Sequence, residues 1–210
     1  MYTYERDGTE IYRRSFAAIR AGADLSRVPV DLEPVAVRMI HACGMLDLPD
    51  DLAWSPDVGE AARAALAAGR PVIADSQMVA HGVTRRRLPA ANPVVCTVGD
   101  PGVPGDAQQL GTTRSAAAVD RWRPHLDGAV VAIGNAPTAL FRLLELLAGD
   151  PPGPRPAAII GVPVGFVGSA ESKVALSRGD HGVPWLTVHG TRGGSALAAA
   201  AVNALASRAL

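Results

Sequence analysis

The fold follows from one stretch, residues 157–173, AAIIGVPVGFVGSAESK. Its first four residues are apolar, Gly161, Gly165 and Gly168 then interrupt it, and Ser169 opens the next segment. This order predicts a buried strand, a loop where the backbone approaches another group, and the start of a helix. In an α/β protein such a loop lies at the carboxyl end of a strand, where ligands bind.

The same pattern recurs along the chain. Residues 71–75, 92–97, 129–133 and 184–188 are short apolar runs, and segments with helical character separate them. Strands that alternate with helices predict a mainly parallel, doubly wound sheet with right-handed crossovers. We therefore expect one α/β domain over residues 1–210 with a five-stranded sheet. The glycine- and proline-rich segment 99–105 is predicted to be a mobile surface loop.

Three helices are expected before the first strand, over residues 8–22, 33–43 and 57–68, and the first two carry the candidate site residues. Residues 8–22 have apolar side chains at helical spacing, with Tyr12 and Ser15 on a neighbouring face. The next helix has Pro34 in its first turn and ends at Gly44. Within it, Arg38 and His41 are three residues apart and so share one face.

Composition narrows the class of protein. The chain has 48% hydrophobic and 4% aromatic residues, which suits close packing of helices on a sheet. No apolar run of 18 residues and no apolar signal core occur, so a soluble, cytoplasmic protein with no membrane partner is expected. A net charge of zero argues against a nucleic-acid partner. Cys43 and Cys96 fit neither a disulfide framework nor metal-ligand spacing, and buried free thiols are expected.

The kind of cation is also informative. Lys173 is the only lysine among the 20 basic residues, and all the others are arginines. Because the planar guanidinium group matches carboxylates in shape and charge, a polyanionic small molecule is one candidate ligand. Lys173 itself is interpreted either as a cation of the site or as a partner of Glu171.

Three strand ends carry glycines: residues 134–135, 161–168 and 190–195. In a parallel sheet they meet at one edge, and the free amides of the following helices, near Pro137, Ser169 and Ser195, would favour anionic groups. The alternative is that these glycines serve only as turn residues. None of the three forms a phosphate-binding loop or a complete dinucleotide fingerprint.

His41 is the best titratable candidate, because an imidazole changes charge near neutral pH. The alternative is a hydrogen-bonded histidine on a buried helix face. No histidine pair has metal-binding spacing. A Ser-His-Asp triad is weakly supported because no nucleophile elbow is present. The pattern alone indicates an α/β enzyme for a small anionic ligand.

Taken together, several segments resemble the precorrin-8X methylmutase family, the precorrin isomerases of corrin biosynthesis. They occur in the family's order, span residues 11–206, and include the highly specific stretch 161–173. The segments are residues 15–19, 38–44, 75–82, 134–140, 161–173, 192–196 and 203–205. Thr191 departs from the pattern, where Gly or Arg is more usual.

The resemblance implies a flavodoxin-like, three-layer fold and a homodimer with its site near the subunit interface. The implied reaction moves a methyl group from C-11 to C-12 of precorrin-8X, a tetrapyrrole, and gives hydrogenobyrinate without redox change, cofactor or metal. His41 matches the family's histidine, whose implied role is general acid toward a ring nitrogen. Protonation withdraws electrons from the macrocycle and eases a [1,5]-sigmatropic shift, and a positioned acid typically contributes ~10²–10⁴-fold.

The implied substrate carries acetate and propionate arms, which guanidinium forks and N–H or O–H donors would bind. The resemblance assigns this role to arginines as carboxylate clamps and to smaller residues as hydrogen-bond donors. The clamps are Arg38, Arg85, Arg86, Arg114 and Arg192, and the donors are Tyr12, Ser15, Thr84, Gly193, Gly194 and Ser195.

Three alternatives stay open. In the first, the chain is a non-catalytic tetrapyrrole carrier with the same fold. In the second, it is a cobalt-precorrin-8 methylmutase. In the third, it is an α/β hydrolase or transferase that uses a serine. The motifs quoted above are shared by the metal-free and cobalt-containing variants of the pathway. The absence of a nucleophile elbow counts against the hydrolase.

Overall fold

One mostly parallel sheet organises the chain, in a computed structural model that describes residues 2–149 and 153–207. The strand order is β1-β6-β5-β4-β2-β3, and only β1 runs antiparallel to its neighbour, β6. The strands are β1 Leu52–Trp54, β2 Val72–Ala74, β3 Val94–Val95, β4 Val130–Ile133, β5 Ala158–Gly161 and β6 Trp185–Val188.

Five of these strands, β2 to β6, lie where the sequence predicts them, but the sheet has six strands and not five. The prediction missed β1, which is three residues long and directly follows the short helix α3, Leu48–Asp51. So short a strand has too few residues to show alternation. Residues 52–54 form a strand because they pair with the edge of β6, where Leu52 lies opposite Val188.

The prediction of a loop over residues 99–105 was also wrong in part. Helix α6, Val103–Gln109, begins inside this segment, with Pro104 in its first turn. Proline is favoured there because the first helical N–H groups need no partner within the helix. The buried side chain of Val103 anchors this turn on the core.

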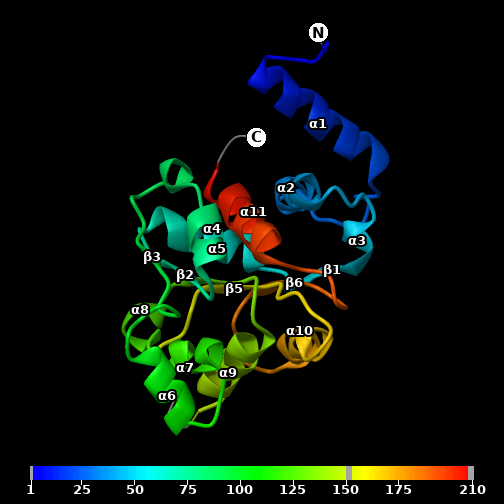
Figure 1. The fold of residues 1–210 in the computed structure, drawn as a ribbon. Coiled ribbons are helices and arrows are strands. Elements are labelled where there is room, and N and C mark those ends of the chain that lie inside the picture. Colours follow the sequence, from blue (N-terminus) through cyan, green and yellow to red (C-terminus); the bar gives the residue numbers. More distant parts are fainter. Residues whose placement is uncertain (1, 150–152, 208–210) are drawn as a thin grey trace.

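Helices cover both faces of the sheet (Figure 1). On one face lie α1 Gly8–Gly22, α2 Glu33–Cys43, α4 Val58–Ala67, α5 Gln77–Gly82 and α11 Ser195–Ala206, with the short 3₁₀ helix η1 Arg85–Arg87. On the other face lie α6, α7 Arg114–Asp120, α8 Arg123–Leu126, α9 Pro137–Leu147 and α10 Ser169–Arg178.

Alternation along the strands divides the interior into two cores. In β4, Val130 and Ala132 point into the core under α2 and α11, whereas Val131 and Ile133 point into the core under α9. Each central strand is therefore buried on both faces, as its unbroken apolar run predicts. No helix within the described ranges is both long and apolar enough to cross a bilayer.

Helix α1 stands off from this body. Asp7 caps it by accepting hydrogen bonds from the N–H groups of Thr9 and Glu10, and only Phe16 and Ile19 are buried. Figure 1 shows the helix projecting past α2 with the N-terminus at its far end. Helix α1 therefore packs on the body along one short apolar face.

Candidate active site

The residues that surround His41 come from two helices in contact. Tyr12, Ser15 and Phe16 share one face of α1, since they are spaced three and four residues apart. Arg38 and His41 share one face of α2, as the sequence predicts. The two faces meet where α1 crosses α2, which brings all five side chains together.

The imidazole of His41 is held on three sides. The Ser15 hydroxyl lies 3.0 Å from Nδ1. The rings of Tyr12 and Phe16 have their centroids 5.2 Å from the imidazole, at 39° and 82°. Because Nδ1 is engaged by Ser15, Nε2 is the nitrogen left to exchange a proton with a ligand. The histidine is exposed, so it is not the buried structural residue of the alternative reading.

Two cavities flank this cluster. The His41 cavity, about 260 Å³, is lined by Tyr12, Arg38, His41, Ala42, Gly82, Thr84, Arg87, Ala196, Ala199, Ala200 and Asn203. The α1 groove, about 540 Å³, is lined by Gly8, Thr9, Tyr12, Arg13, Phe16, Arg20, Arg38 and Arg87. Tyr12, Arg38 and Arg87 belong to both, so the cavities share one wall. In the described part of the chain, neither lining contains an Asp or Glu.

Asn203 connects the His41 cavity to the segment before η1. Its Oδ1 accepts a hydrogen bond from the Thr84 N–H at 2.8 Å, and its Nδ2 donates to the Gly82 carbonyl at 2.9 Å. This fixes the backbone that presents Thr84 and Arg87 to the cavity. Sequence reasoning did not place Asn203 in the site, and from the run of arginines at 85–87 it assigned Arg85 and Arg86 but not Arg87. The available signal for Asn203 was its place in a segment that resembles the family.

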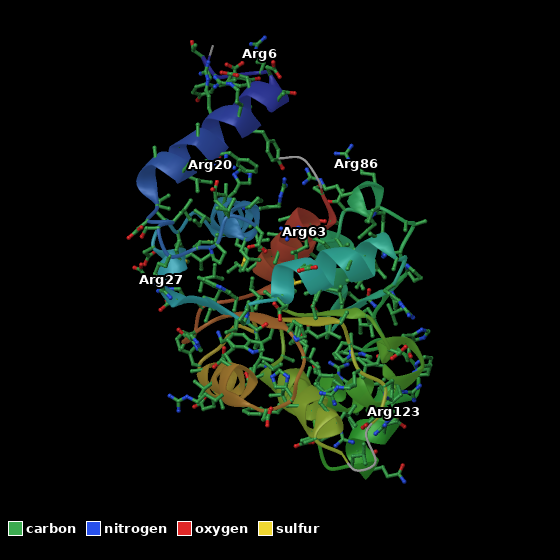
Figure 2. All side chains as sticks on the ribbon, turned by 180° about the vertical axis from the view of Figure 1, so that it is seen from behind. Arg6, Arg20, Arg27, Arg63, Arg86 and Arg123 are labelled. Carbon is green, nitrogen blue, oxygen red and sulfur yellow. The ribbon has the colours of Figure 1, made fainter. Side chains whose placement is uncertain are left out.

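The structure thus brings together Tyr12, Ser15, Arg38, His41 and Thr84, and adds Arg87. Arg85 and Arg86, the other residues of η1, are exposed and line neither cavity. Figure 2 shows Arg86 pointing away from the protein. Arg114 begins α7, on the opposite face of the sheet from His41 (Figure 1).

The remaining predicted residues lie in the segment that joins β6 to α11. Arg192 is paired with Asp47 at 2.7 Å and with Asp51 at 3.5 Å. The N–H of Gly194 donates to the Val162 carbonyl, and the Ser195 hydroxyl lies 3.3 Å from that of Ser76. Gly193 packs so closely on the backbone of residues 162–163 that no side chain would fit.

The glycine-rich strand ends therefore meet, as predicted, but largely pack on one another. Gly134 lies against the backbone of Gly194 and Ser195 at the start of α11, where an added Cβ would overlap. Neither cavity is lined by residues 134–137 or 161–169. No three His, Cys, Asp or Glu side chains gather as a metal site within residues 2–149 and 153–207.

Asp75 organises the edge of the sheet beside β2. Its carboxylate accepts hydrogen bonds from the N–H groups of Gly134, Asn135 and Ala136, at 2.8–3.0 Å. Burial raises the pKa of this carboxyl, and the three N–H donors oppose that shift. Asp75 thus ties the end of β2 to the segment between β4 and α9.

Lys173 anchors the segment between β6 and α11 through a hydrogen bond. The side chain is fully buried in α10, and its ammonium donates a 2.6 Å hydrogen bond to the Arg192 carbonyl. Desolvation lowers the pKa of Lys173 to about 8, and the nearby Asp51 carboxylate partly opposes this. The residue is therefore a structural cation and not an ion-pair partner of Glu171.

This burial predicts a pH dependence of stability. The unfolded chain keeps the Lys173 proton up to a pKa of about 10.4, whereas the folded chain releases it near pH 8. Between these values the unfolded state binds more protons, so the free energy of unfolding should rise with pH, by up to about 3 kcal/mol. In Lys173→Met this contribution is absent. Chemical denaturation of both proteins at pH 7, 8, 9 and 10 measures the difference, and parallel curves would contradict the prediction.

The fold and the residues around His41 together define a class of protein. A doubly wound α/β fold carries an imidazole, held by a hydroxyl and two aromatic rings, beside cavities whose charged side chains are all cationic. Such a site suits an enzyme that binds a small anionic ligand beside a titratable group.

Comparison with known proteins gives the family. A family model described as precorrin-8X methylmutase matches residues 10–208. The precorrin-8X methylmutase of Pseudomonas aeruginosa is 62% identical over 98% of this chain and 98% of that protein. The cobalt-precorrin-8 methylmutase of Salmonella typhimurium is 39% identical over 82% of this chain and 80% of that protein.

A solved structure agrees. The crystal structure of the precorrin-8X methyl mutase from Thermus thermophilus superposes with a TM-score of 0.85, at 37% identity, over 95% of each chain. The chain therefore belongs to the precorrin-8X methylmutase family and is an isomerase of cobalamin biosynthesis.

Proposed function

We propose that this chain converts precorrin-8X to hydrogenobyrinate by moving the methyl group on C-11 to C-12. The observation that carries the proposal is the placement of His41, with Nδ1 engaged by Ser15 and the ring in the wall of a cavity lined by arginines. A protonated imidazole delivers its proton through Nε2 to a ring nitrogen of the macrocycle. Ser15 accepts from Nδ1–H and keeps the ring in place during the transfer.

The reaction balances without any other reactant. The C-11–methyl bond breaks as the C-12–methyl bond forms, and the conjugated electrons rearrange around the ring. The proton that His41 lends returns to it, so the product has the composition of the substrate. The residues present supply what this chemistry needs, namely one proton donor and cations for the carboxylate arms.

The relatives favour the metal-free substrate. Identity is 62% to a protein named for precorrin-8X and 39% to one named for the cobalt-containing compound. Both chemistries use the same migration, so the difference concerns what fills the centre of the macrocycle. We therefore assign this chain to the metal-free pathway.

Visible spectroscopy of the purified protein with metal-free precorrin-8X tests the assignment. We expect the chromophore of hydrogenobyrinate to appear, at more than one turnover per site. A bound chromophore that never converts would contradict catalysis on this substrate and support the carrier. Conversion of cobalt-precorrin-8 alone would overturn the choice of pathway while leaving the migration in place.

We also propose a homodimer in which α1 contacts the second copy. In the single chain, Ile11 and Tyr12 of α1 are 45% and 44% exposed, although both are large and apolar in character. Helix α1 projects from the body (Figure 1), and Tyr12 lines both cavities. A second copy that packs on α1 would enclose the site. Sedimentation analysis that finds only monomer at micromolar concentration would contradict this.

A further inference from the structure

One wall of the His41 cavity is a turn between two short helices. Helix α5 ends at Gly82 and η1 begins at Arg85, and we call residues 82–84 the wall turn. The Gly82 carbonyl is the last of α5, and the Thr84 N–H comes just before η1. Backbone groups at helix ends need partners from outside the helix. None of the three residues of η1 is buried, so burial of η1 does not hold the wall turn in place.

Asn203 supplies a partner to both of these backbone groups. Its Oδ1 accepts a hydrogen bond from the Thr84 N–H at 2.8 Å, and its Nδ2 donates to the Gly82 carbonyl at 2.9 Å. A carboxamide can do this because it carries an acceptor and two donors side by side without a charge. Asn203 is half-buried and lines the cavity. The wall turn is therefore tied to α11, although Thr84 and Asn203 are 119 residues apart in the chain.

Helix α11 also supports the helix that carries His41. It packs on α2 and on α5, and Figure 1 shows it between them. Its side toward the cavity has three small side chains and one amide, namely Ala196, Ala199, Ala200 and Asn203. Gly82 lies so close to this side that an added Cβ would be 2.6 Å from that of Ala199. One helix thus sets the spacing between His41 and the wall turn.

We propose that Asn203 is a positioning residue, which holds the wall turn on α11 at the distance from His41 that the ligand requires. That this ligand is the tetrapyrrole rests on the proposed function. Asn203 acts through the backbone of residues 82–84 and takes no part in the proton transfer. Its loss should therefore weaken binding in the productive orientation, while proton transfer from His41 continues once the substrate is bound.

A leucine at this position keeps the shape of the side chain and removes both hydrogen bonds. For Asn203→Leu we expect KM for precorrin-8X to rise about 5- to 50-fold, with kcat within about threefold of the wild type. Asn92→Leu is the matched control. Asn92 is only 4% exposed, donates to the Leu66 and Arg70 carbonyls at 2.8 and 2.7 Å, and lines neither cavity.

The two variants should differ in opposite directions. Asn92→Leu should lower the thermal midpoint more than Asn203→Leu, because its unpaired partners are more deeply buried, and should leave KM unchanged. A KM of Asn203→Leu equal to that of the wild type would overturn the positioning role. If precorrin-8X is not converted, the proposed function fails on its own, and titration with hydrogenobyrinate gives the same comparison as dissociation constants.

Hydrogen exchange at the Thr84 amide tests the tie without any ligand. We expect this amide to exchange at least about tenfold faster in Asn203→Leu than in the wild type. Asn203→Asp keeps an acceptor oxygen, so its Thr84 amide should stay as slow as in the wild type. If the leucine variant does not fold, Asn203→Ser replaces it, since serine is too short to span both groups. Equal exchange rates in the wild type and the leucine or serine variant would overturn the proposal.

Discussion

Replacing His41 with alanine should lower kcat by about 10²–10⁴-fold, the largest effect expected of any single change on activity. The imidazole is the proton donor of the proposed reaction, and no other histidine lines the two cavities within the described residues. His41 is exposed on α2 and is not part of either hydrophobic core, so the fold should survive its loss. Single-turnover absorbance measurements with precorrin-8X give the rate of the chemical step directly.

Measuring the affinity for the product distinguishes a variant that has lost catalysis from one that has lost the binding site. Titration with hydrogenobyrinate should give a dissociation constant for His41→Ala close to that of the wild type. His125→Ala is a suitable control, because His125 is exposed on α8 across the sheet and touches neither cavity. Turnover by His41→Ala at the wild-type rate would remove His41 from the mechanism.

Replacing Asp75 with alanine should lower the free energy of unfolding by roughly 2–5 kcal/mol, the largest expected effect on stability. The carboxylate accepts three backbone N–H groups, and those of Gly134 and Ala136 belong to buried residues. Alanine would leave these donors unpaired away from water, at a cost of about 1–3 kcal/mol for each buried group. Urea denaturation followed by circular dichroism measures the change.

Two further variants test whether the loss of stability comes from the hydrogen bonds that the Asp75 carboxylate accepts. Asp75→Asn keeps one acceptor oxygen but turns an NH₂ group toward backbone donors, so its loss should be close to that of alanine. Asp57 also precedes a helix, but it is exposed and makes no side-chain cap hydrogen bond. Asp57→Ala should therefore change stability by no more than about 0.5 kcal/mol. A denaturation midpoint of Asp75→Ala equal to that of the wild type would contradict the structural role given to this carboxylate.

Local patterns in the chain decided most of the sheet. The apolar runs at residues 129–133 and 157–161 predict strands buried on both faces, because they are short for helices and glycine segments follow them. Strand β1 escaped this reasoning, since its three residues acquire strand geometry only through pairing with β6. Helix α6 escaped it because Pro104 and Gly105 resemble loop residues until a buried Val103 anchors them.

In the candidate site, too, the sequence predicted some features and the tertiary structure alone showed others. The sequence by itself determined that Arg38 and His41 share a helix face, and the resemblance to a known family gave His41 its role. Only the tertiary structure showed that Arg87, and not Arg85 or Arg86, reaches the cavity, since a turn of 3₁₀ helix points its three side chains in different directions.

Arg192 shows the physical reason most clearly. The family resemblance implies that it is a carboxylate clamp, but in the fold it is paired with Asp47, 145 residues earlier in the chain. Periodicity and capping depend on neighbours a few residues apart, so the sequence carries them openly. Which acid neutralises which arginine depends on segments that approach only after folding, and so only the tertiary structure could show that Arg192 is already paired.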